Sequence, residues 1–263
     1  MPISRILVIA GSDSGGGAGI QADIKTISML GGYAMTAITA LTAQNTQTVS
    51  AVLPIEPDFI TQQIQVVADD IGVDVIKTGM LHNQDVILAV AKAVKAIDCP
   101  LVLDPVMVAT SGDKLLKDDA IDALKTELLP LADVVTPNVP EAELLSGITI
   151  KTRDDMIEAA KAMEALGAKA VLLKGGHLEG ETLYDLLWYD NQPYWYESPR
   201  IDTVHTHGTG CTLASAVATL LGQGNALLDA VEAARAYVLK AIQTAPELGH
   251  GHGPLNHLHP LKR

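Results

Sequence analysis

Short apolar runs of Val, Ile and Leu alternate along this chain with longer segments of helical periodicity, and this alternation constrains the fold most strongly. The runs typical of strands lie at 6–10, 33–41, 73–77, 101–103, 132–135 and 170–173. The helical segments lie at 20–30, 58–71, 85–97 and 154–166. Strand–helix–strand units of this spacing form right-handed crossovers and a parallel sheet with helices on both faces. The pattern therefore predicts an α/β fold of three layers.

One segment departs from the alternation. Residues 183–189 and 194–198 are rich in aromatic and apolar side chains and flank a turn at 190–193. They predict an antiparallel hairpin at an edge of the sheet. Because we find no repeat, low-complexity stretch or linker, we expect residues 1–263 to form a single domain.

Composition narrows the function classes. The chain is 48% hydrophobic but only 3% aromatic, which suits an aliphatic core around buried parallel strands. A net charge of −13 disfavours binding to nucleic acids and to anionic membranes. The two cysteines form no disulfide framework, and no apolar run approaches a spanning helix or a signal peptide. We expect a soluble cytoplasmic protein.

Ligands of open α/β sheets bind at the carboxyl ends of the strands, so the residues after each strand matter most. A glycine-rich loop at 11–19 follows the first strand and can bring backbone N–H groups close to a ligand. It is not a Walker loop, because Gly17 stands where Lys is needed. Residues 17–22 match a dinucleotide motif, but 36–44 lack the acid that holds a ribose. Asp23 is either a surface acid at the helix start or a ligand-facing carboxylate.

Polar residues follow the next strands as well. The amide of Gln44 can pair with the edge of a heteroaromatic ring, or it belongs to a polar loop. Asp104 is either a metal or water ligand or a turn residue before Pro105. Asn138 and Glu141 have the spacing of a capping box, and they are equally candidates for contacting Mg²⁺ and phosphate.

Two later motifs favour phosphate binding. Lys174 lies beside glycines at a strand end, where it can meet a phosphate or be an exposed turn residue. Residues 207–211 precede a helix and leave its first N–H groups free, which favours an anion hole over a plain loop. There the helix dipole favours the Cys211 thiolate, unless Cys211 is simply a small buried residue. The His-rich tail at 249–259 is better explained as a loop packed against the site than as a metal site.

Taken in order, these motifs resemble the hydroxymethylpyrimidine/phosphomethylpyrimidine kinases of thiamin biosynthesis, within the ribokinase-like superfamily. The resemblance covers residues 6–259. Its specific pieces are 10–13, 15–23, 42–46, 77–81, 104–107, 136–141, 174–177 and 206–212. Each piece alone is weak, but the ordered set is highly specific.

The resemblance implies a ribokinase-like three-layer αβα fold with a mostly parallel sheet, and it suggests a homodimer. It implies an ATP- and Mg²⁺-dependent transfer of phosphate to a hydroxymethyl group, giving first a monophosphate and then a diphosphate. The implied substrate-binding residues are Gly11, Asp23, Gln44, Met80 and Val106. The implied nucleotide- and phosphate-binding residues are Asn138, Lys174, Gly208, Thr209 and Gly210.

Metal binding and catalysis complete the expected site. Asp104 and Glu141 are the expected Mg²⁺ ligands. Ribokinase-like enzymes commonly carry Asp at the place of Cys211, whereas the pyrimidine kinases resemble this chain in having Cys. Our hypothesis is that Cys211 accepts the hydroxyl proton and that Lys174 neutralises the transferring phosphoryl group.

Three other functions compete with this interpretation. A pyridoxal kinase of the same fold also acts on a hydroxymethyl group of a heteroaromatic ring, although Gln44 favours an aminopyrimidine. A dinucleotide oxidoreductase would use residues 17–22 but lacks the ribose acid. A non-catalytic pyrimidine-binding protein would not need Asp104, Glu141 and Lys174.

Overall fold

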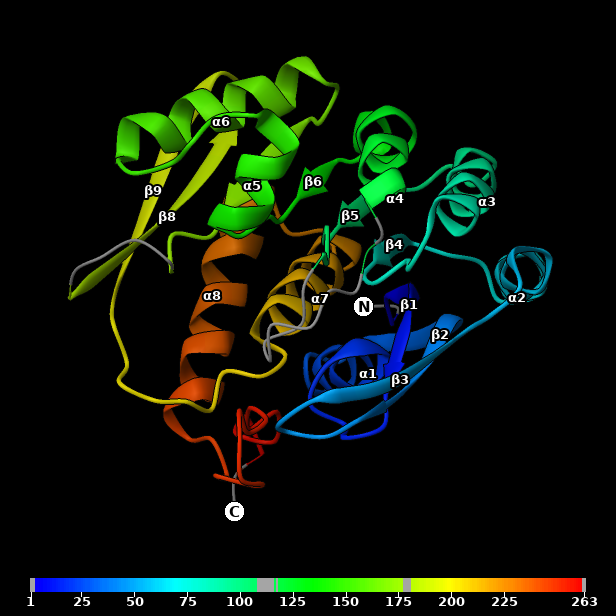
Figure 1. The fold of residues 1–263 in the computed structure, drawn as a ribbon, viewed down its shortest axis with the longest axis horizontal. Helices are drawn as coiled ribbons and strands as arrows, with labels where there is room; N and C mark the ends of the chain where they lie inside the picture. The colour runs from blue at the N-terminus through cyan, green and yellow to red at the C-terminus, as the bar shows by residue number, and fades with distance from the viewer. Residues whose placement is uncertain (1–2, 108–115, 117, 177–180, 262–263) are drawn as a thin grey trace.

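The computed structural model describes residues 3–107, 116, 118–176 and 181–261 (Figure 1). The strands are β1 (Arg5–Asp13), β2 (Tyr33–Gln44), β3 (Val49–Pro54), β4 (Val75–Thr78), β5 (Leu101–Leu103), β6 (Val134–Val135), β7 (Ala170–Leu173), β8 (Thr182–Tyr189) and β9 (Gln192–Pro199). The helices are α1 (Gly19–Met29), α2 (Pro57–Asp70), α3 (Gln84–Lys95), α4 (Asp118–Ala123), α5 (Val139–Ser146), α6 (Arg153–Ala165), α7 (Thr209–Gly222) and α8 (Leu227–Gln243). A π-helical turn (Leu124–Leu128) and a 3-10 turn (Leu129–Leu131) follow α4.

All the strands of the described residues form one sheet in the order β3-β2-β1-β4-β5-β6-β7-β8-β9. The six central strands of the sheet are parallel: β2, β1, β4, β5, β6 and β7. The outer strands β3, β8 and β9 pair antiparallel at the two edges. After β2 the chain returns to the other side of β1 to form β4. This reversal of strand order leaves a crevice beyond the carboxyl ends of the strands, where ligands of such folds bind.

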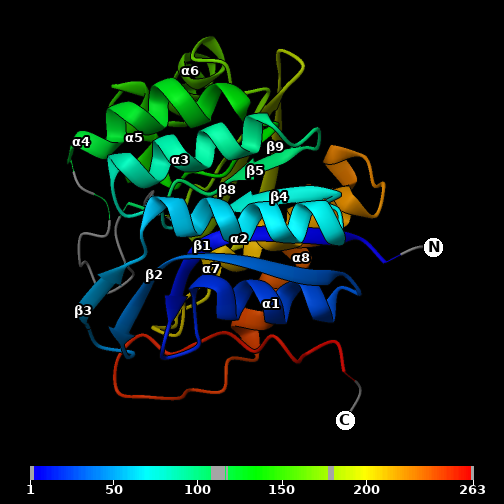
Figure 2. The same cartoon turned by 90° about the vertical axis from the view of Figure 1, so that its right-hand side faces the viewer.

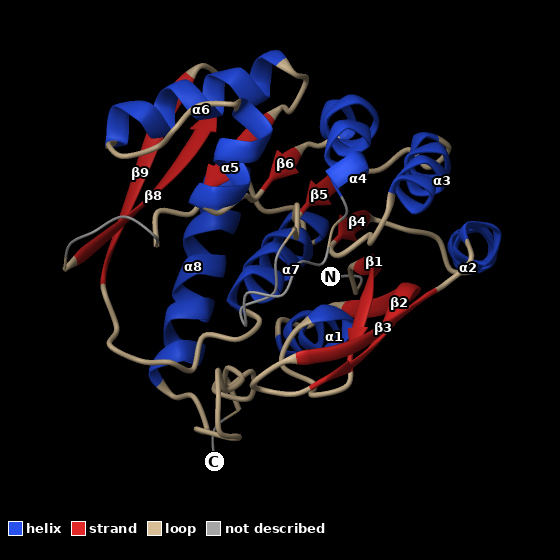
Figure 3. Cartoon of the chain, in the orientation of Figure 1, coloured by secondary structure: helices blue, strands red, loops and turns tan. Residues whose placement is uncertain are grey.

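Helices cover both faces of the sheet, as the sequence pattern predicts. Figure 3 shows α1, α7 and α8 on one side of the strands and α2 to α6 on the other. Alternate residues of β1 point to opposite faces: Leu7 and Ile9 enter one core cluster, and Ile6 and Val8 enter the other. The cores are built mainly of Val, Ile, Leu and Ala, which agrees with the scarcity of aromatic residues.

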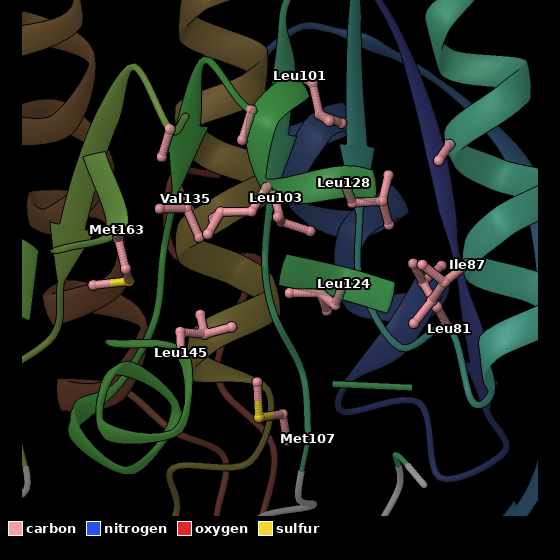
Figure 4. Packing of buried hydrophobic residues seen from close by; sticks show 14 of the residues in the cluster. Leu81, Ile87, Leu101, Leu103, Met107, Leu124, Leu128, Val135, Leu145 and Met163 are labelled. Carbon is pink, nitrogen blue, oxygen red and sulfur yellow. The ribbon is translucent and has the colours of Figure 1, made fainter. Parts of the chain in front are cut away.

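Figure 4 shows part of the larger core cluster. Leu103 and Val135 of the sheet and Leu124 and Leu128 of the segment after α4 all belong to it, and each is at most 2% exposed. Burial of aliphatic side chains on this scale provides the main driving force for folding. The packed core holds the strand ends that carry the polar residues in fixed positions.

The predicted strands at 101–103 and 170–173 are confirmed with the same bounds as β5 and β7. The hairpin is confirmed too, but its turn is shorter than the predicted 190–193, because β9 already begins at Gln192. Asp190 and Asn191 alone form the turn, both in the left-handed region with φ of 53° and 56°. Asp and Asn tolerate this region, and a two-residue turn of this kind matches the twist of paired strands.

Three elements, β3, α4 and α8, were not predicted, nor were the two turns after α4. The edge strand β3 is largely exposed and lacks a continuous apolar run. The buried face of α8 consists largely of small Ala side chains, which give a weak apolar signal. Figure 2 shows the C-terminal segment, in red, running below α1 in that view. Within the described residues, no helix has both the length and the apolar character needed to cross a membrane.

Candidate active site

A cavity of about 900 Å³ opens at the carboxyl ends of the parallel strands. Its wall combines the end of β1, the residues that follow β4 to β7, and the first turn of α7. The predicted site residues that line it are Gly11, Gln44, Met80, Asp104, Val106, Asn138, Glu141, Lys174, Gly208, Thr209, Gly210 and Cys211. Residues far apart in sequence therefore meet at one site, as the position of each after a strand predicts.

Asp23 is the predicted site residue that does not line this cavity. Its side chain is fully buried, so it is not a surface acid. Lys77 lies 2.9 Å and 3.1 Å from its two carboxylate oxygens, and the Ser215 hydroxyl donates to it at 2.6 Å. We expected the Asp23 side chain to face a ligand, but these partners hold it between α1, β4 and α7.

Gln44 is the last residue of β2 rather than part of the loop after it. Its backbone carbonyl accepts a hydrogen bond from the Ser14 hydroxyl, and its backbone N–H donates to the same hydroxyl. Thr42 donates to the side-chain oxygen of Gln44 at 3.1 Å. This contact orients the amide at the cavity wall beside the glycine-rich loop.

Asp104, Glu141 and Lys174 form an ionic cluster on the cavity wall. Lys174 Nζ lies 3.5 Å from Asp104 Oδ1, which also accepts from the Thr136 hydroxyl at 3.2 Å. Burial acts to lower the pKa of Lys174, but the charges of Asp104 and Glu141 and the hydrogen bond to Asp104 outweigh it and raise that pKa. Lys174 therefore stays a cation at neutral pH, as phosphate binding requires. His177 of the same motif lies outside the described residues.

Glu141 caps helix α5 and also has a raised pKa. Its carboxylate accepts from the Asn138 backbone at 2.8 Å, and Asn138 Oδ1 accepts from the Glu141 backbone at 2.9 Å, so the capping box is confirmed. Burial raises the pKa of Glu141 to about 7; the nearby Lys174 opposes this shift and Asp104 adds to it. The carboxyl group is thus poised between its neutral and charged forms.

The chemistry of this cluster fits a divalent cation. Asp104 Oδ2 is buried without a hydrogen-bond partner among the described residues, and burial keeps the pKa of Glu141 at about 7 even beside Lys174. Among the described residues, no group of three His, Cys, Asp or Glu side chains could hold a metal by itself. Mg²⁺ commonly uses one or two carboxylates together with substrate phosphates, so Asp104 and Glu141 suffice.

The N-terminus of α7 has the form of an anion site. Gly208 is the N-cap, with φ of 85° and no side-chain cap. The Thr209 N–H donates to the Thr206 carbonyl, whereas no partner in the described part of the chain accepts from the N–H of Gly210 or Cys211. An ideal Cβ on Gly210 would lie 3.2 Å from Lys174 Nζ, so the helix start and the lysine adjoin. Of the predicted loop, Gly210 and Cys211 therefore offer the free donors.

At Cys211, burial opposes the thiolate that the helix dipole favours. Desolvation raises the pKa of its thiol to about 12, and the charges of Asp23 and Asp104 act in the same direction. The charge of Lys77 and a backbone hydrogen bond from Gly19 lower the pKa, but by less. The helix dipole alone does not overcome these effects, so Cys211 is a neutral thiol at pH 7.

Sequence reasoning missed several residues of the site. Asp13 and His207 line the cavity and pair with each other, although both fall within motifs of the resemblance. Lys77 was part of a predicted strand, where its charge gave no indication of a buried partner. The cavity also extends between β9 and α8, where further apolar residues line it: Ile201, Ala236, Val238, Leu239 and Ile242.

The His-rich tail packs against the site, as predicted. The His252 N–H donates to the Thr46 carbonyl at 2.8 Å, and the Gly253 carbonyl accepts from the His207 N–H at 3.2 Å. His257 Nε2 lies 3.0 Å from the Thr212 hydroxyl. The tail therefore connects the turn after β2 with the start of α7.

Comparison with known proteins relates this geometry to an activity. A family model described as phosphomethylpyrimidine kinase matches residues 13–256. The hydroxymethylpyrimidine/phosphomethylpyrimidine kinase of Streptomyces coelicolor is 46% identical, over 96% of this chain and 93% of its own. A thiamine biosynthesis bifunctional protein of Geobacter sulfurreducens is 49% identical over 98% of the chain, which spans only 53% of that relative.

Solved structures show the same fold. The Bacillus subtilis pyridoxal kinase, solved as an ADP complex, has a TM-score of 0.89 and 41% identity and covers 98% of each chain. The phosphomethylpyrimidine kinase of Clostridium difficile has a TM-score of 0.82 and 43% identity, over 91% of this chain and 99% of its own. The expected ribokinase-like fold is therefore confirmed. With a family match along nearly its whole length and the cavity described above, this chain belongs to the phosphomethylpyrimidine kinase family.

Proposed function

We propose that this protein transfers the terminal phosphate of ATP to 4-amino-5-hydroxymethyl-2-methylpyrimidine, and then adds a second phosphate to the product. The proposal rests mainly on one observation: Lys174 lies beside the free N–H groups of Gly210 and Cys211 at the cavity wall. Phosphoryl transfer depends chiefly on positioning and on stabilising the charge of the transferred group. A buried lysine beside a helix N-terminus supplies both.

The charged end of the site holds the nucleotide phosphates. Lys174 and the α7 N-terminus bind the transferring phosphoryl group, and Asn138 borders the same part of the cavity. Asp104 and Glu141 hold Mg²⁺, which supplies positive charge to the phosphate oxygens when it is bound. With the cation present, Glu141 is ionised and its charge is balanced.

The other end of the site receives the pyrimidine. Gly11, Met80 and Val106 line this end together with Gln44. A Cβ on Gly11 would lie 3.2 Å from Met80 Sδ, so the glycine allows the Met80 side chain to pack against the backbone at this end of the cavity. The amide of Gln44, oriented by Thr42, pairs with the polar edge of the aminopyrimidine. Asp23 supports this wall from beneath through Lys77 and Ser215.

Cys211 faces the substrate hydroxyl and accepts its proton in this proposal. Because burial raises the pKa of its thiol to about 12, Cys211 can act as the base only after the thiol has passed its own proton to water, and the charge of Lys77 favours that loss. Transfer with a weak base is consistent with a reaction that relies mainly on charge stabilisation. Unchanged turnover of a Cys211→Ala variant would contradict the assignment of Cys211 as the base.

Pyridoxal phosphorylation is the second candidate. The Bacillus subtilis and Staphylococcus aureus pyridoxal kinases share the fold, with TM-scores of 0.89 and 0.90 and identities of 41% and 35%. The curated relatives named as pyrimidine kinases are 44–48% identical over nearly the whole chain, which favours the pyrimidine.

Steady-state ADP release with ATP and Mg²⁺ tests the proposal. We expect kcat/KM for the hydroxymethylpyrimidine to exceed that for pyridoxal by at least about tenfold. Lys174→Met should lower kcat on the order of 100- to 1000-fold, because it removes a charge-stabilising donor. Lys169→Met is the matched control, since Lys169 is exposed and pairs with Asp133 outside the cavity. A preference for pyridoxal would contradict the proposal and support pyridoxal phosphorylation instead.

The cellular setting is part of the proposal. We place the enzyme in the cytoplasm, and we propose a homodimer because the family resemblance suggests one. Sedimentation equilibrium tests the dimer directly: a single species with the mass of one chain would contradict it.

A further inference from the structure

Asp13 and His207 join the first and the last loop of the cavity wall, although 194 residues separate them in sequence. His207 Nε2 lies 2.8 Å from Asp13 Oδ2, and the two side chains are only 10% and 3% exposed. The reaction as proposed assigns no step to either residue. Burying a carboxylate and an imidazole is costly unless they are paired, so we expect this buried pair to have a role in the site.

Asp13 organises the glycine-rich loop. Its Oδ1 accepts from the Gly15 N–H at 2.7 Å, and its Oδ2 accepts from Gly17 at 3.0 Å and Ala18 at 2.8 Å. Burial acts to raise the pKa of Asp13, but the hydrogen bonds from His207, Ala18 and Gly15 and the charge of His207 together hold it below its ordinary value. The carboxylate is therefore ionised and fixes the loop that enters α1.

His207 connects the glycine-rich loop to the phosphate end of the site. It directly precedes Gly208, the N-cap of α7. An ideal Cβ on Gly17 would lie 2.4 Å from His207 Cδ2, and one on Gly208 would lie 1.9 Å from the Gly17 carbonyl oxygen. The imidazole and Gly208 thus pack directly on the backbone of the glycine-rich loop, with no space for movement toward it.

The C-terminal segment closes the other side of His207. The Gly253 carbonyl accepts from the His207 N–H, and His207 pairs with Pro254 in an isolated bridge. An ideal Cβ on Gly17 would also lie 3.2 Å from Pro254 Cβ. His207 is therefore held from both sides, and its hydrogen bond to Asp13 sets where the chain enters α7.

We infer that His207, through its hydrogen bond to Asp13, is a positioning residue for phosphoryl transfer. It keeps the N–H groups of Gly210 and Cys211 in a fixed position beside Lys174, and it does not contact the substrate phosphate itself. This inference rests on the proposed kinase function. A displacement of about 1 Å in a group that stabilises the reacting atoms can cost on the order of 100-fold in rate.

Two amide substitutions separate this role from simple packing. In His207→Gln the side-chain nitrogen reaches the position of Nε2 and can donate to Asp13, whereas in His207→Asn it is too short to do so. We expect kcat of His207→Asn to fall on the order of 100-fold, and His207→Gln to stay within about tenfold of the natural protein. KM for ATP and for the pyrimidine should change by less than about threefold in both, since neither variant removes a ligand contact.

His250→Gln is the matched control, because His250 is exposed in the tail. All variants are assayed at a temperature where circular dichroism shows them folded. Equal kcat losses in the two amide variants, a loss confined to KM, or a kcat of His207→Asn within about threefold of the natural protein would each overturn the positioning role. Absence of ADP release by the natural protein and by His250→Gln would instead contradict the proposed function.

Discussion

The ammonium nitrogen of Lys77 lies 2.9 Å from one carboxylate oxygen of Asp23 and 3.1 Å from the other, and neither side chain is exposed to solvent. Burial acts to lower the pKa of Lys77, but the charges of Asp23 and Asp104 and the hydrogen bond to Asp23 outweigh it and keep the ammonium charged. Asp23 also accepts from Ser215, one helical turn beyond Cys211 on α7. The ion pair therefore ties β4 and α1 to the helix that begins at the anion site.

Removal of one partner of this pair should be strongly destabilising. Lys77→Met leaves the Asp23 carboxylate buried without its counter-charge, and we expect the free energy of unfolding to fall by about 3–5 kcal/mol. Urea denaturation measures the change. The double variant Lys77→Met with Asp23→Asn removes both charges and should recover more than half of the loss.

Lys169→Met is the control for this prediction, because the Lys169–Asp133 pair lies at the surface. Its cost should stay within about 1 kcal/mol, as for other exposed ion pairs. A loss in Lys77→Met no larger than that of the control would contradict the structural role of the buried pair.

Gly208 cannot accept a side chain. Its φ of 85° disfavours any L-residue, and an added Cβ would lie 1.9 Å from the Gly17 carbonyl oxygen. Gly208→Ala should therefore lower kcat on the order of 100-fold by displacing the start of α7, and should also lower the thermal midpoint. Gly147→Ala is the matched control: it has a similar φ of 74° but nothing within 4 Å of the added Cβ.

The control should lose only about 1 kcal/mol of stability from backbone strain and should retain its activity. Thermal unfolding and ADP release are measured on the same preparations. Equal activity in the two alanine variants would show that the contact between Gly208 and Gly17 does not position the anion site.

The strand ends could be predicted from the sequence because local chemistry determines them. Leu101–Leu103 and Ala170–Leu173 are short buried aliphatic runs bounded by polar residues, and their bounds match the prediction. The capping box of Asn138 and Glu141 follows from a spacing of three residues. Each of these features depends on neighbours within a few positions of the chain.

Burial and long-range pairing could not be predicted in this way. Asp23 meets Lys77 across 54 residues and Ser215 across 192, so its sequence position at the start of a helix was equally compatible with exposure. The thiol of Cys211 illustrates the same limit. The local helix dipole favours a thiolate, but desolvation by distant segments raises the pKa to about 12.

His257 should make stability depend on pH. Burial lowers its pKa to about 4, and the charges of Lys25 and His259 act in the same direction. Between pH 4 and the ordinary value of about 6.5, the unfolded chain binds this proton more readily. The contribution of His257 to stability is therefore fully present above pH 6.5 and is lost as the pH falls toward 4.

The His257→Gln variant isolates this contribution. The natural protein should lose on the order of 3 kcal/mol more than the variant as the pH falls from 7 to 4. Urea denaturation of both proteins across this range gives the difference directly. Parallel pH profiles of the two proteins would show that His257 is not buried as a neutral imidazole.

Asp104→Asn tests the proposed cation site. The substitution keeps the size of the side chain but removes the charge of the carboxylate whose Oδ2 has no hydrogen-bond partner in the described part of the chain. We expect the Mg²⁺ concentration for half-maximal ADP release to rise by at least about tenfold. Asp133→Asn, outside the cavity, should leave it unchanged. An unchanged Mg²⁺ requirement in Asp104→Asn would remove Asp104 from the metal site.

The most direct test of the proposed kinase activity is to follow the products by mass spectrometry after mixing the protein with the hydroxymethylpyrimidine, ATP and Mg²⁺. The natural protein should form the monophosphate first and the diphosphate afterwards, and Lys174→Met should form neither at a comparable rate. A mixture in which the pyrimidine gains no phosphate, while pyridoxal is phosphorylated under the same conditions, would contradict the central claim.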